Sequence, residues 1–386
     1  MTTFDRIRDF QDSLPKLGIA GNDLAVYVDG VPFYRYMSGY RNLERKEKVD
    51  RDTVFRMFSM TKPITVIAAM QLYEQGRFML YDPLYLYLPE FREMKVREKD
   101  PDGNERIVPA KNPILIRQLF EMTAGFDYDS HCPELTALYE STKGQFTLEE
   151  VVKVIASRPL LFEPGTHWYY SFAHDVLARL VEVVSGMRYG EYLKKFIFDP
   201  LGMKTATHHP DAWTKERLCE CYDLGEDGVF RLIPGSLFTL YDVPNYEGGG
   251  SGLFVTVDDY AKFATALTSM GASSDGKRII AASTIDVIRE NHLNEALLRE
   301  FAEAKPHRRG YGYGLGVRTL ISKASSDSLS SIGEFGWSGY LGTYVSMDPG
   351  TGVTIVFADQ VLPKARSIHS KIRNLVYAAL EYEGIL

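Results

Sequence analysis

The chain has 386 residues and a formal net charge of −7, with 45% hydrophobic and 25% charged residues. This composition is ordinary for a globular protein with a sizeable core, and at ~150 residues per domain the length suggests two or three structural units. The negative charge argues against a nucleic-acid surface. No stretch reaches the roughly 18 apolar residues of a membrane helix. From the charge and from this absence, we expect neither nucleic acid nor a membrane as a partner.

Two features bear on the cellular compartment. The first ten residues mix aspartate and arginine with apolar residues, unlike the basic and then apolar order of a secretion signal. The three cysteines, Cys132, Cys219 and Cys221, are an odd number and build no disulfide framework. Both features predict a cytoplasmic location.

The first part of the chain predicts a helix, a hairpin and a second helix. Residues 4–15 have a helical pattern, and the strand-like runs 24–28 and 33–37 flank Asp29-Gly30, a typical hairpin turn. Strand-like residues then lead into an apolar helix near Ser59. Pro63 falls in the first turn of this helix, where the missing N–H of proline costs nothing.

The rest of the chain is predicted to be helical first and then rich in strands. Residues 80–185 have a mostly helical pattern with polar loops, including a charged insertion at 97–106 and an amphipathic helix at 176–184. Strands are predicted at 312–321, 331–336, 341–347 and 352–358, and a terminal helix at about 364–383. We expect the first hairpin and the last strands to share one sheet.

The fold class expected from this order is α/β (α+β): an antiparallel sheet flanked by helices, with an inserted mostly helical domain. We place the α/β sandwich domain at residues 1–79 and 186–386, and the helical domain at residues 80–185. The active site is then expected at the junction of the two lobes.

Ser59-Met60-Thr61-Lys62 is the most informative motif. A serine and a lysine three positions apart on a helix point to the same side, and the helix N-terminus favours negative charge there. We expect burial to lower the pKa of Lys62 and let it act as a base. The same spacing recurs at Ser13–Lys16 and Ser274–Lys277, which Pro15 and a Ser-Ser-Asp-Gly turn mark as surface.

Two further segments accompany this motif. The loop at 164–171 contains Tyr170 and runs into an amphipathic helix, a common way to present a side chain on a rigid support. Near the C-terminus, residues 335–343 contain Trp337-Ser338-Gly339-Tyr340 and lead into an alternating strand. Glycine at position 339 would let a strand backbone approach a ligand closely.

With these motifs the chain resembles the serine β-lactamase and penicillin-binding-protein superfamily, and within it the class C-like esterases called family VIII carboxylesterases. The first family motif, Ser-x-x-Lys, matches Ser59 and Lys62. The second, Tyr-x-Asn, reads Tyr170-Ser171-Phe172, and the third, Lys/His-x-Gly, reads Trp337-Ser338-Gly339. Matching segments at 58–62, 163–165, 200–203 and 248–253 extend the resemblance over most of the chain.

The resemblance implies a β-lactamase-like fold and an acyl-enzyme mechanism. It makes Ser59 the nucleophile, Lys62 and Tyr170 a coupled proton-transfer pair, and the backbone N–H groups of Ser59 and Tyr340 the oxyanion hole. The substrate-binding residues expected around them are Phe58, Phe172, Trp337, Ser338 and Gly339. No cofactor and no metal are expected, and the expected partner is a small-molecule ester.

Two positions depart from the lactamase pattern. Phe172 replaces the asparagine that helps to hold the acyl-amide side chain of the substrate, and Trp337 replaces the lysine or histidine that pairs with a substrate carboxylate. Both changes exchange polar recognition for aromatic surface. We therefore predict a serine hydrolase that cleaves neutral, small or short-acyl carboxylic esters in preference to β-lactams.

Three alternatives stay open: acyl transfer to an organic acceptor instead of water, weak β-lactamase activity, and a non-catalytic scaffold of the same fold. The Gly-x-Ser-x-Gly nucleophile elbow of α/β-hydrolases does not occur. His208-His209 lacks a second ligand cluster and is predicted at the surface or a pocket rim. His167 is predicted to pack, and the three glycines at 248–250 to form a tight turn near the cleft.

Overall fold

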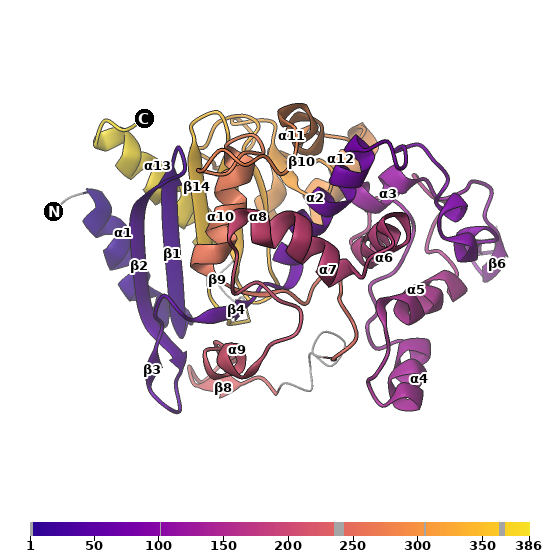
Figure 1. Cartoon of the computed structure of the whole chain (residues 1–386), viewed down its shortest axis with the longest axis horizontal. Helices are drawn as coiled ribbons and strands as arrows, with labels where there is room; N and C mark the ends of the chain where they lie inside the picture. Colours follow the sequence, from indigo (N-terminus) through magenta and orange to yellow (C-terminus); the bar gives the residue numbers. More distant parts are fainter. Residues whose placement is uncertain (1–2, 101, 235–242, 305, 363–366) are drawn as a thin grey trace.

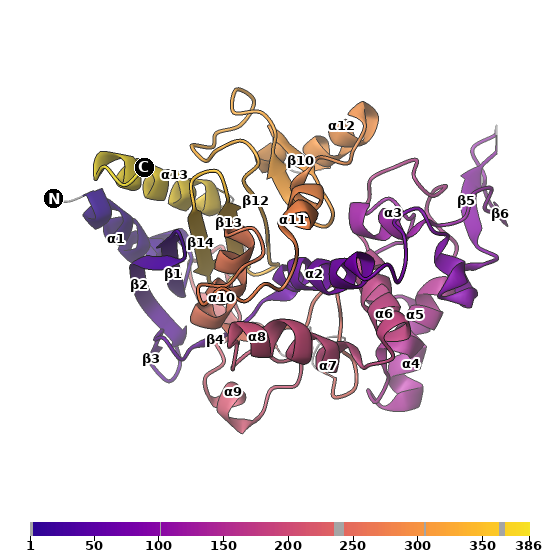
Figure 2. The ribbon, with the colours of Figure 1, turned by 45° about the horizontal axis from the view of Figure 1, so that its top comes forward.

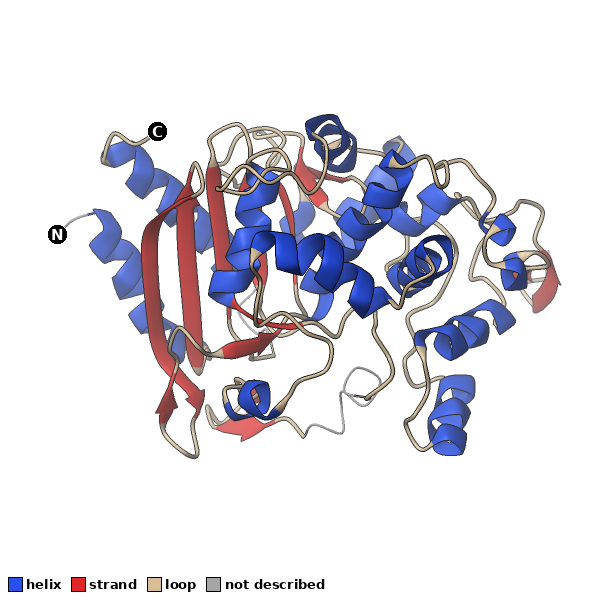
Figure 3. Ribbon diagram, viewed as in Figure 1, coloured by secondary structure: helices blue, strands red, loops and turns tan. Residues whose placement is uncertain are grey.

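The structure is a computed structural model that describes residues 3–100, 102–234, 243–304, 306–362 and 367–386 (Figure 1). An eight-stranded sheet forms one side of the molecule, and helices form most of the other side (Figure 3). In order across the sheet, the strands are β10 (Tyr311–Tyr313), β11 (Arg318–Leu320), β12 (Phe335–Ser338), β13 (Tyr344–Asp348), β14 (Val353–Ala358), β1 (Gly21–Val28), β2 (Val31–Asn42) and β3 (Glu47–Lys48).

All neighbouring strands of this sheet run antiparallel, and the N-terminal hairpin pairs with the last strand through β1 and β14. The predicted sharing of one sheet by the two ends of the chain is therefore confirmed. The hairpin turn is Asp29-Gly30, and both residues have positive φ angles (49° and 76°), as a two-residue turn between twisted strands requires.

Both faces of the central strands are covered by helices. Leu24 and Val26 of β1 pack with Ile355 of β14 in a core shared with α1 (Thr3–Ser13) and α13 (Ile368–Tyr382). The residues next to them on the same strands, Ala25 of β1 and Val356 of β14, belong to the larger core on the other face of the sheet. There α10 (Val257–Thr268) contacts the sheet. Alternate side chains of a strand point to opposite faces, so these apolar runs fit a central strand.

The helix α2 (Thr61–Glu74) joins the sheet side to the helical side (Figure 2). Every residue from Thr61 to Leu72 is buried, as the apolar sequence predicts for a core helix. It packs against α6 (Ala173–Ser185), and the other helices of this side are α3 (Ile116–Glu121), α4 (Pro133–Thr142), α5 (Leu148–Ser157) and α7 (Tyr189–Leu193). The predicted domain boundaries at 79/80 and 185/186 stay a prediction.

The remaining elements lie around these layers. They are β4 (Val54–Arg56), which pairs with β9 (Phe254–Thr256); the hairpin of β7 (Tyr222–Leu224) and β8 (Phe230–Leu232); and the helices α8 (Asp199–Leu201), α9 (Ala212–Glu216), α11 (Ala282–Arg289) and α12 (Glu295–Ala304). No helix within the described ranges is long and apolar enough to cross a membrane.

Two local predictions were wrong, and the predicted terminal helix is confirmed. The predicted strand at 312–321 is a hairpin of β10 and β11, because the chain turns at Gly314 and Gly316, where φ is 74° at Gly316. The charged insertion at 97–106 belongs to a second hairpin, β5 (Lys95–Lys99) with β6 (Glu105–Pro109), and not to a polar loop. The terminal helix begins at Ile368; residues 364–366 of its predicted range lie outside the described residues.

Candidate active site

Ser59 lies in a single 3₁₀ turn, Phe58–Met60, between β4 and α2. Its side chain is partly exposed, whereas the residues on either side of it are buried. Phe58 has a φ of 46°, in the left-handed region that a bulky aromatic residue rarely adopts. Local strain of this kind costs about 1–3 kcal/mol and persists only where the surroundings impose it, so the turn that aims Ser59 is held by the fold.

Lys62 lies one turn further along, with its side chain fully buried. Its Nζ is 3.5 Å from Ser59 Oγ and donates a 2.6 Å hydrogen bond to the carbonyl oxygen of Gly250. The same ammonium lies 4.5 Å from the ring centre of Tyr170 and 5.4 Å from that of Tyr128. The predicted pairing of Ser59 with Lys62 is thus present in the geometry, and Tyr170 adjoins Lys62.

The pKa of Lys62 differs from expectation. Burial alone would lower it, but the oxygens of Tyr128 and Tyr170 and the nearby Asp175 carboxylate outweigh burial and raise the pKa above its ordinary value. The expected lowering is therefore wrong, because burial was considered without the tyrosine and carboxylate oxygens near the amine. A charged ammonium has no lone pair to accept a proton, so Lys62 is suited to stabilise negative charge near Ser59.

Tyr170 is held by aromatic neighbours. The indole N–H of Trp337 donates to Tyr170 Oη at 3.4 Å, and the two rings are stacked with their centres 5.9 Å apart. Tyr128 meets Tyr170 edge-on at 5.2 Å. An N–H donor and a cation, Lys62, therefore both lie beside Tyr170.

The end of β12 comes close to the turn that carries Ser59. A Cβ at Gly339 would lie 2.0 Å from Thr343 Oγ1 and 2.5 Å from the carbonyl oxygen of Met57, so only glycine fits there. Thr343 Oγ1 also donates to the Met57 carbonyl at 3.2 Å. This close approach agrees with the role predicted for Gly339. Tyr340 follows on the exposed tip, and the oxyanion hole formed by its N–H and that of Ser59 stays a prediction.

Two residues predicted to bind substrate have almost no accessible surface. Phe58 is 5% exposed and packs with Leu341 and Cys221, meeting the Tyr340 ring at 6.0 Å. Phe172 is 1% exposed, with its ring 4.8 Å from that of Tyr128. Their aromatic rings support other residues at the cleft instead of lining it. Trp337 is also mostly buried but touches Tyr170 directly, and Ser338 next to it is partly exposed.

A family model described as beta-lactamase matches residues 5–377. The chain belongs to the beta-lactamase family. The fold of this family therefore accounts for the sheet and the helical side described above, and the motif residues Ser59, Lys62 and Tyr170 lie together as the family order implies.

The relatives of this beta-lactamase family protein include named esterases. Esterase EstB of Burkholderia gladioli is 27% identical over 385 residues, covering 96% of this chain and 93% of the relative. Lovastatin esterase of Penicillium rubens is 28% identical over 323 residues, covering 79% and 77%. The solved structure of EstCE1, described as a hydrolase with promiscuous acyltransferase activity, superposes with a TM-score of 0.79 at 24% identity, covering 97% and 98%.

Several residues at this beta-lactamase family site escaped the sequence analysis. Tyr128 approaches from the loop before α4, and the Gly250 carbonyl from the glycine run. Asp175 accepts from Tyr246 Oη at 2.5 Å and from Gly250 N at 3.3 Å, which fixes that run beside Lys62. A Cβ at Gly250 would lie 2.5 Å from Asp175 Oδ2, so the glycine run passes close to this carboxylate, and the tight turn predicted for it stays a prediction.

The remaining candidates lie elsewhere. Ser274 is exposed and Ser13 partly exposed, as predicted. His208 is 5% exposed and belongs to the interior, so its predicted place at the surface or rim is wrong, while His209 pairs with Glu247 at 2.8 Å. His167 Nδ1 lies 2.7 Å from Glu300 Oε1. Within the described ranges, no group of three His, Cys, Asp or Glu side chains is arranged to hold a metal.

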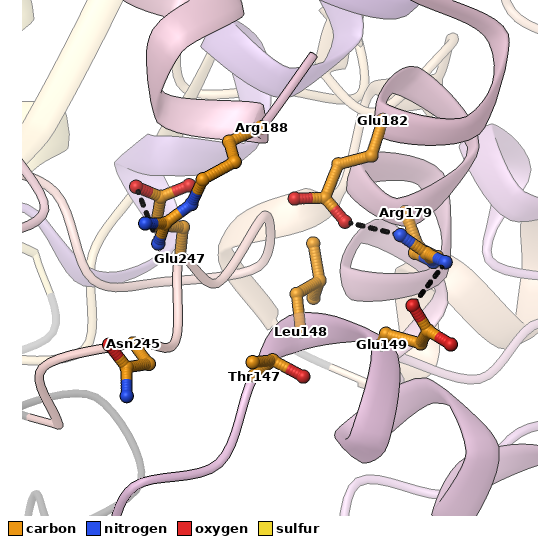
Figure 4. A pocket seen from close by; sticks show the side chains of 8 residues that line it. All are labelled: Thr147, Leu148, Glu149, Arg179, Glu182, Arg188, Asn245 and Glu247. Carbon is orange, nitrogen blue, oxygen red and sulfur yellow. Dashed lines mark hydrogen bonds and ion pairs between the residues drawn. The ribbon is translucent and has the colours of Figure 1, made fainter. Parts of the chain in front are cut away.

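A cavity of about 340 Å³ lies apart from these residues, between α5, α6 and the segment before the glycine run (Figure 4). Its charges are largely paired within its own wall: Arg179 bonds both Glu149 and Glu182, and Arg188 faces Glu247. Burial would raise the pKa of Glu247, but hydrogen bonds from His209 and the Gly190 N–H lower it to about 2. The wall is therefore held by its own ion pairs.

Proposed function

We propose that this protein is a serine hydrolase that cleaves small or short-acyl carboxylic esters through an acyl-enzyme on Ser59. The observation that carries the proposal is the cluster of Ser59 Oγ, the buried Lys62 ammonium and Tyr170, within one beta-lactamase family fold. The esterase names of two relatives support the ester as substrate.

In the first half-reaction, Ser59 Oγ attacks the ester carbonyl carbon and its proton passes to Tyr170 Oη. Lys62 and the Trp337 N–H stabilise the phenolate that accepts this proton, which is why we assign the base to Tyr170 and not to the lysine. The carbonyl oxygen takes the negative charge of the tetrahedral intermediate, toward the N–H groups of Ser59 and Tyr340. When the intermediate collapses, the C–O bond to the alcohol breaks and Tyr170 returns the proton to the leaving oxygen.

In the second half-reaction, water replaces the alcohol. Tyr170 takes a proton from the water, the hydroxide attacks the acyl carbon, and Ser59 leaves with the proton from Tyr170. Carboxylic acid and free enzyme result. Which of the two coupled groups holds the proton at rest is a property of the pair, so the pH profile will report apparent values for both together.

Acyl transfer to an alcohol is a second candidate, favoured by the aromatic side chains beside Tyr170. The rings of Trp168, Tyr128 and Trp337 lie within 6.5 Å of the Tyr170 ring. Aromatic walls favour an organic acceptor over water at the acyl-enzyme stage. Product analysis in the presence of added short-chain alcohols separates the two outcomes, since transfer yields a new ester and hydrolysis only the acid.

The test of the proposed function is labelling with a fluorophosphonate probe, followed by mass spectrometry of the modified peptide. We expect the label on Ser59, together with turnover of p-nitrophenyl acetate or butyrate. A protein that takes no label and cleaves neither ester would instead be a scaffold of the same fold. Hydrolysis of nitrocefin measures the remaining alternative, β-lactamase activity. We expect nitrocefin to be a poorer substrate than the p-nitrophenyl esters.

We also propose a cytoplasmic location for the reaction. The cysteines support it, because Cys132, Cys219 and Cys221 are all buried thiols. Thiols of this kind persist in a reducing compartment. Fractionation of the native host, followed by activity measurement, tests the location.

A further inference from the structure

Arg308 is a partly buried cation beside the candidate active site, and its surroundings are unusual. It lies in the 3₁₀ turn η7 (Pro306–Arg308) that follows α12. Its guanidinium carbon is 4.6 Å from the ring centre of Phe301, 4.9 Å from that of Trp168 and 5.6 Å from that of Trp337. Three aromatic rings thus surround one positive charge.

No carboxylate within the described ranges pairs with this charge, and Arg308 Nη1 is buried without a hydrogen-bond acceptor. Three other partly or fully buried arginines are neutralised: Arg35 by Asp23 at 2.6 Å, Arg179 by Glu149 at 2.6 Å and Arg318 by Glu334 at 3.0 Å. An unpaired guanidinium removed from water is costly. A site that keeps one therefore suits an anion that arrives from outside.

The surrounding contacts fix Arg308 relative to the reacting groups. Trp337 bonds Tyr170 Oη, and Trp168 lies two residues before Tyr170 in the same loop. Glu300 of α12 ties this loop to the helix before Arg308, accepting from Trp168 N at 2.8 Å. The guanidinium thereby lies one aromatic ring away from Tyr170, because Arg308 and Tyr170 both contact Trp337.

We propose that Arg308 is a specificity-determining residue that binds a carboxylate carried by the ester substrate. The proposal rests on the ester hydrolase function proposed above and defines its substrate class. Aromatic stacking holds the planar guanidinium in one orientation, and its free N–H groups match the two oxygens of a carboxylate. The neutral preference inferred from Trp337 alone changes accordingly, because the cation lost from the third motif is supplied by a different element.

The test uses two matched pairs of esters. The mono-4-nitrophenyl ester of adipic acid carries a carboxylate on the acyl side, and its neutral partner is the corresponding methyl 4-nitrophenyl diester. 4-Acetoxybenzoate carries the carboxylate on the alcohol side, and its neutral partner is methyl 4-acetoxybenzoate. The ratio of kcat/KM for the anionic and the neutral member is measured for the wild type and for Arg308→Gln, Arg308→Met and Arg308→Lys. Arg309→Gln, at an exposed neighbouring arginine, is the control.

We expect the wild type to favour the anionic member of at least one pair, and that pair identifies the side of the ester that carries the charge. Arg308→Gln and Arg308→Met should lower the anionic-to-neutral ratio by about 10–100-fold, the usual worth of a hydrogen bond to a charged group, through a higher KM. Arg308→Lys should keep part of the preference, and Arg309→Gln all of it. Added salt should raise KM for the anionic ester alone.

Two results overturn the inference and leave the proposed function intact: a wild-type ratio near one for both pairs, or an equal loss on both members in Arg308→Gln, which would mean that Arg308 acts on Tyr170 or on the fold. Fluorophosphonate labelling of Ser59 in the Arg308 variants separates a misfolded protein from a folded one with altered specificity. Absence of both turnover and labelling in the wild type would instead overturn the proposed function, and this inference with it.

Discussion

Two buried cations, Lys62 at the candidate active site and Arg318 in the sheet, have similar aromatic neighbours. They differ in the groups that their charged atoms contact. Each lies near two tyrosine rings: Tyr128 and Tyr170 for Lys62, and Tyr311 and Tyr344 for Arg318. In both cases tyrosine oxygens and a nearby carboxylate raise the pKa against the effect of burial.

The difference lies in what the cation touches. Arg318 forms an ion pair with Glu334 at 3.0 Å and a 2.7 Å hydrogen bond to Tyr344 Oη, so its charge is neutralised in place. Lys62 instead bonds a backbone carbonyl and faces the Ser59 hydroxyl. A neutralised cation stabilises structure, whereas an ammonium that faces neutral oxygens is available to charge that develops during a reaction. The comparison predicts that changes at the two places affect different properties.

The largest effect is expected at the hydroxyl that Lys62 faces. Ser59→Ala should lower turnover by about 10⁴–10⁶-fold and abolish probe labelling, because no other group can form the acyl-enzyme. Thermal unfolding should change little. Ser274→Ala, in an exposed turn with the same Ser-x-x-Lys spacing, is the matched control and should be silent. Retained esterase activity in Ser59→Ala would falsify the nucleophile assignment.

The next effect concerns the cation itself and its tyrosine. Lys62→Ala and Tyr170→Phe should each lower kcat by about 10²–10⁴-fold, the range of general acid–base groups. The double variant should lose far less than the product of the two, since the pair acts as one unit. The test is a double-mutant cycle, in which steady-state kinetics on a p-nitrophenyl ester are measured for the wild type, the two single variants and the double variant. Fully additive losses would mean that the two residues act independently.

Changes at the ion pair of Arg318 should lower the stability of the fold and leave the catalytic rate nearly unchanged. Glu334→Gln leaves Arg318 buried without its countercharge, and we expect a loss of about 3–5 kcal/mol in the free energy of unfolding. Urea denaturation measures this loss, and Glu226→Gln, at an exposed position, is the control. The kcat of the folded fraction should stay within a factor of about two. A large fall in kcat without loss of stability would contradict the comparison.

The smallest effect is expected at the hydrogen bond between Trp337 and Tyr170. Trp337→Phe keeps an aromatic ring but removes the N–H donor, so kcat should fall by about 2–10-fold, the usual worth of one hydrogen bond. Steady-state kinetics on a p-nitrophenyl ester measure this fall. Trp213→Phe, at an exposed tryptophan of α9, serves as control. An unchanged kcat in Trp337→Phe would mean that this hydrogen bond has no part in the reaction.

Much of the site could be predicted because its motifs are local in sequence. Ser59 and Lys62 are one turn apart, and Tyr170 and Trp337 each stand at a fixed place in a recognisable segment. The Lys62 environment could not be predicted, because its decisive partners are a backbone carbonyl at Gly250 and a tyrosine from another loop, Tyr128. A tyrosine from a distant loop leaves no signature beside Lys62 in the sequence, so the direction of the lysine pKa was wrong.

The fold, like the site, has features that the sequence predicts and features that it does not. The sheet formed by both ends of the chain followed from apolar runs and turn residues, whereas the strand predicted at 312–321 failed at Gly314 and Gly316, whose turn signal was overlooked. Arg308 was missed although two adjacent arginines precede Gly310, because only tertiary structure reveals that its charge has no carboxylate beside it. Sequence patterns report periodicity and turns well, and report the balance of charge between distant segments poorly.

The pairing of β1 with β14 determines when a growing chain becomes an enzyme. Ser59 and Lys62 leave the ribosome well before Trp337, Gly339 and β14, because those residues lie much further along the chain. Until β14 arrives, one edge of β1 is unpaired and open to strands of other nascent chains, so interrupted synthesis exposes the molecule to aggregation. The nucleophile is thereby made long before Trp337 and Gly339 can join it at the site.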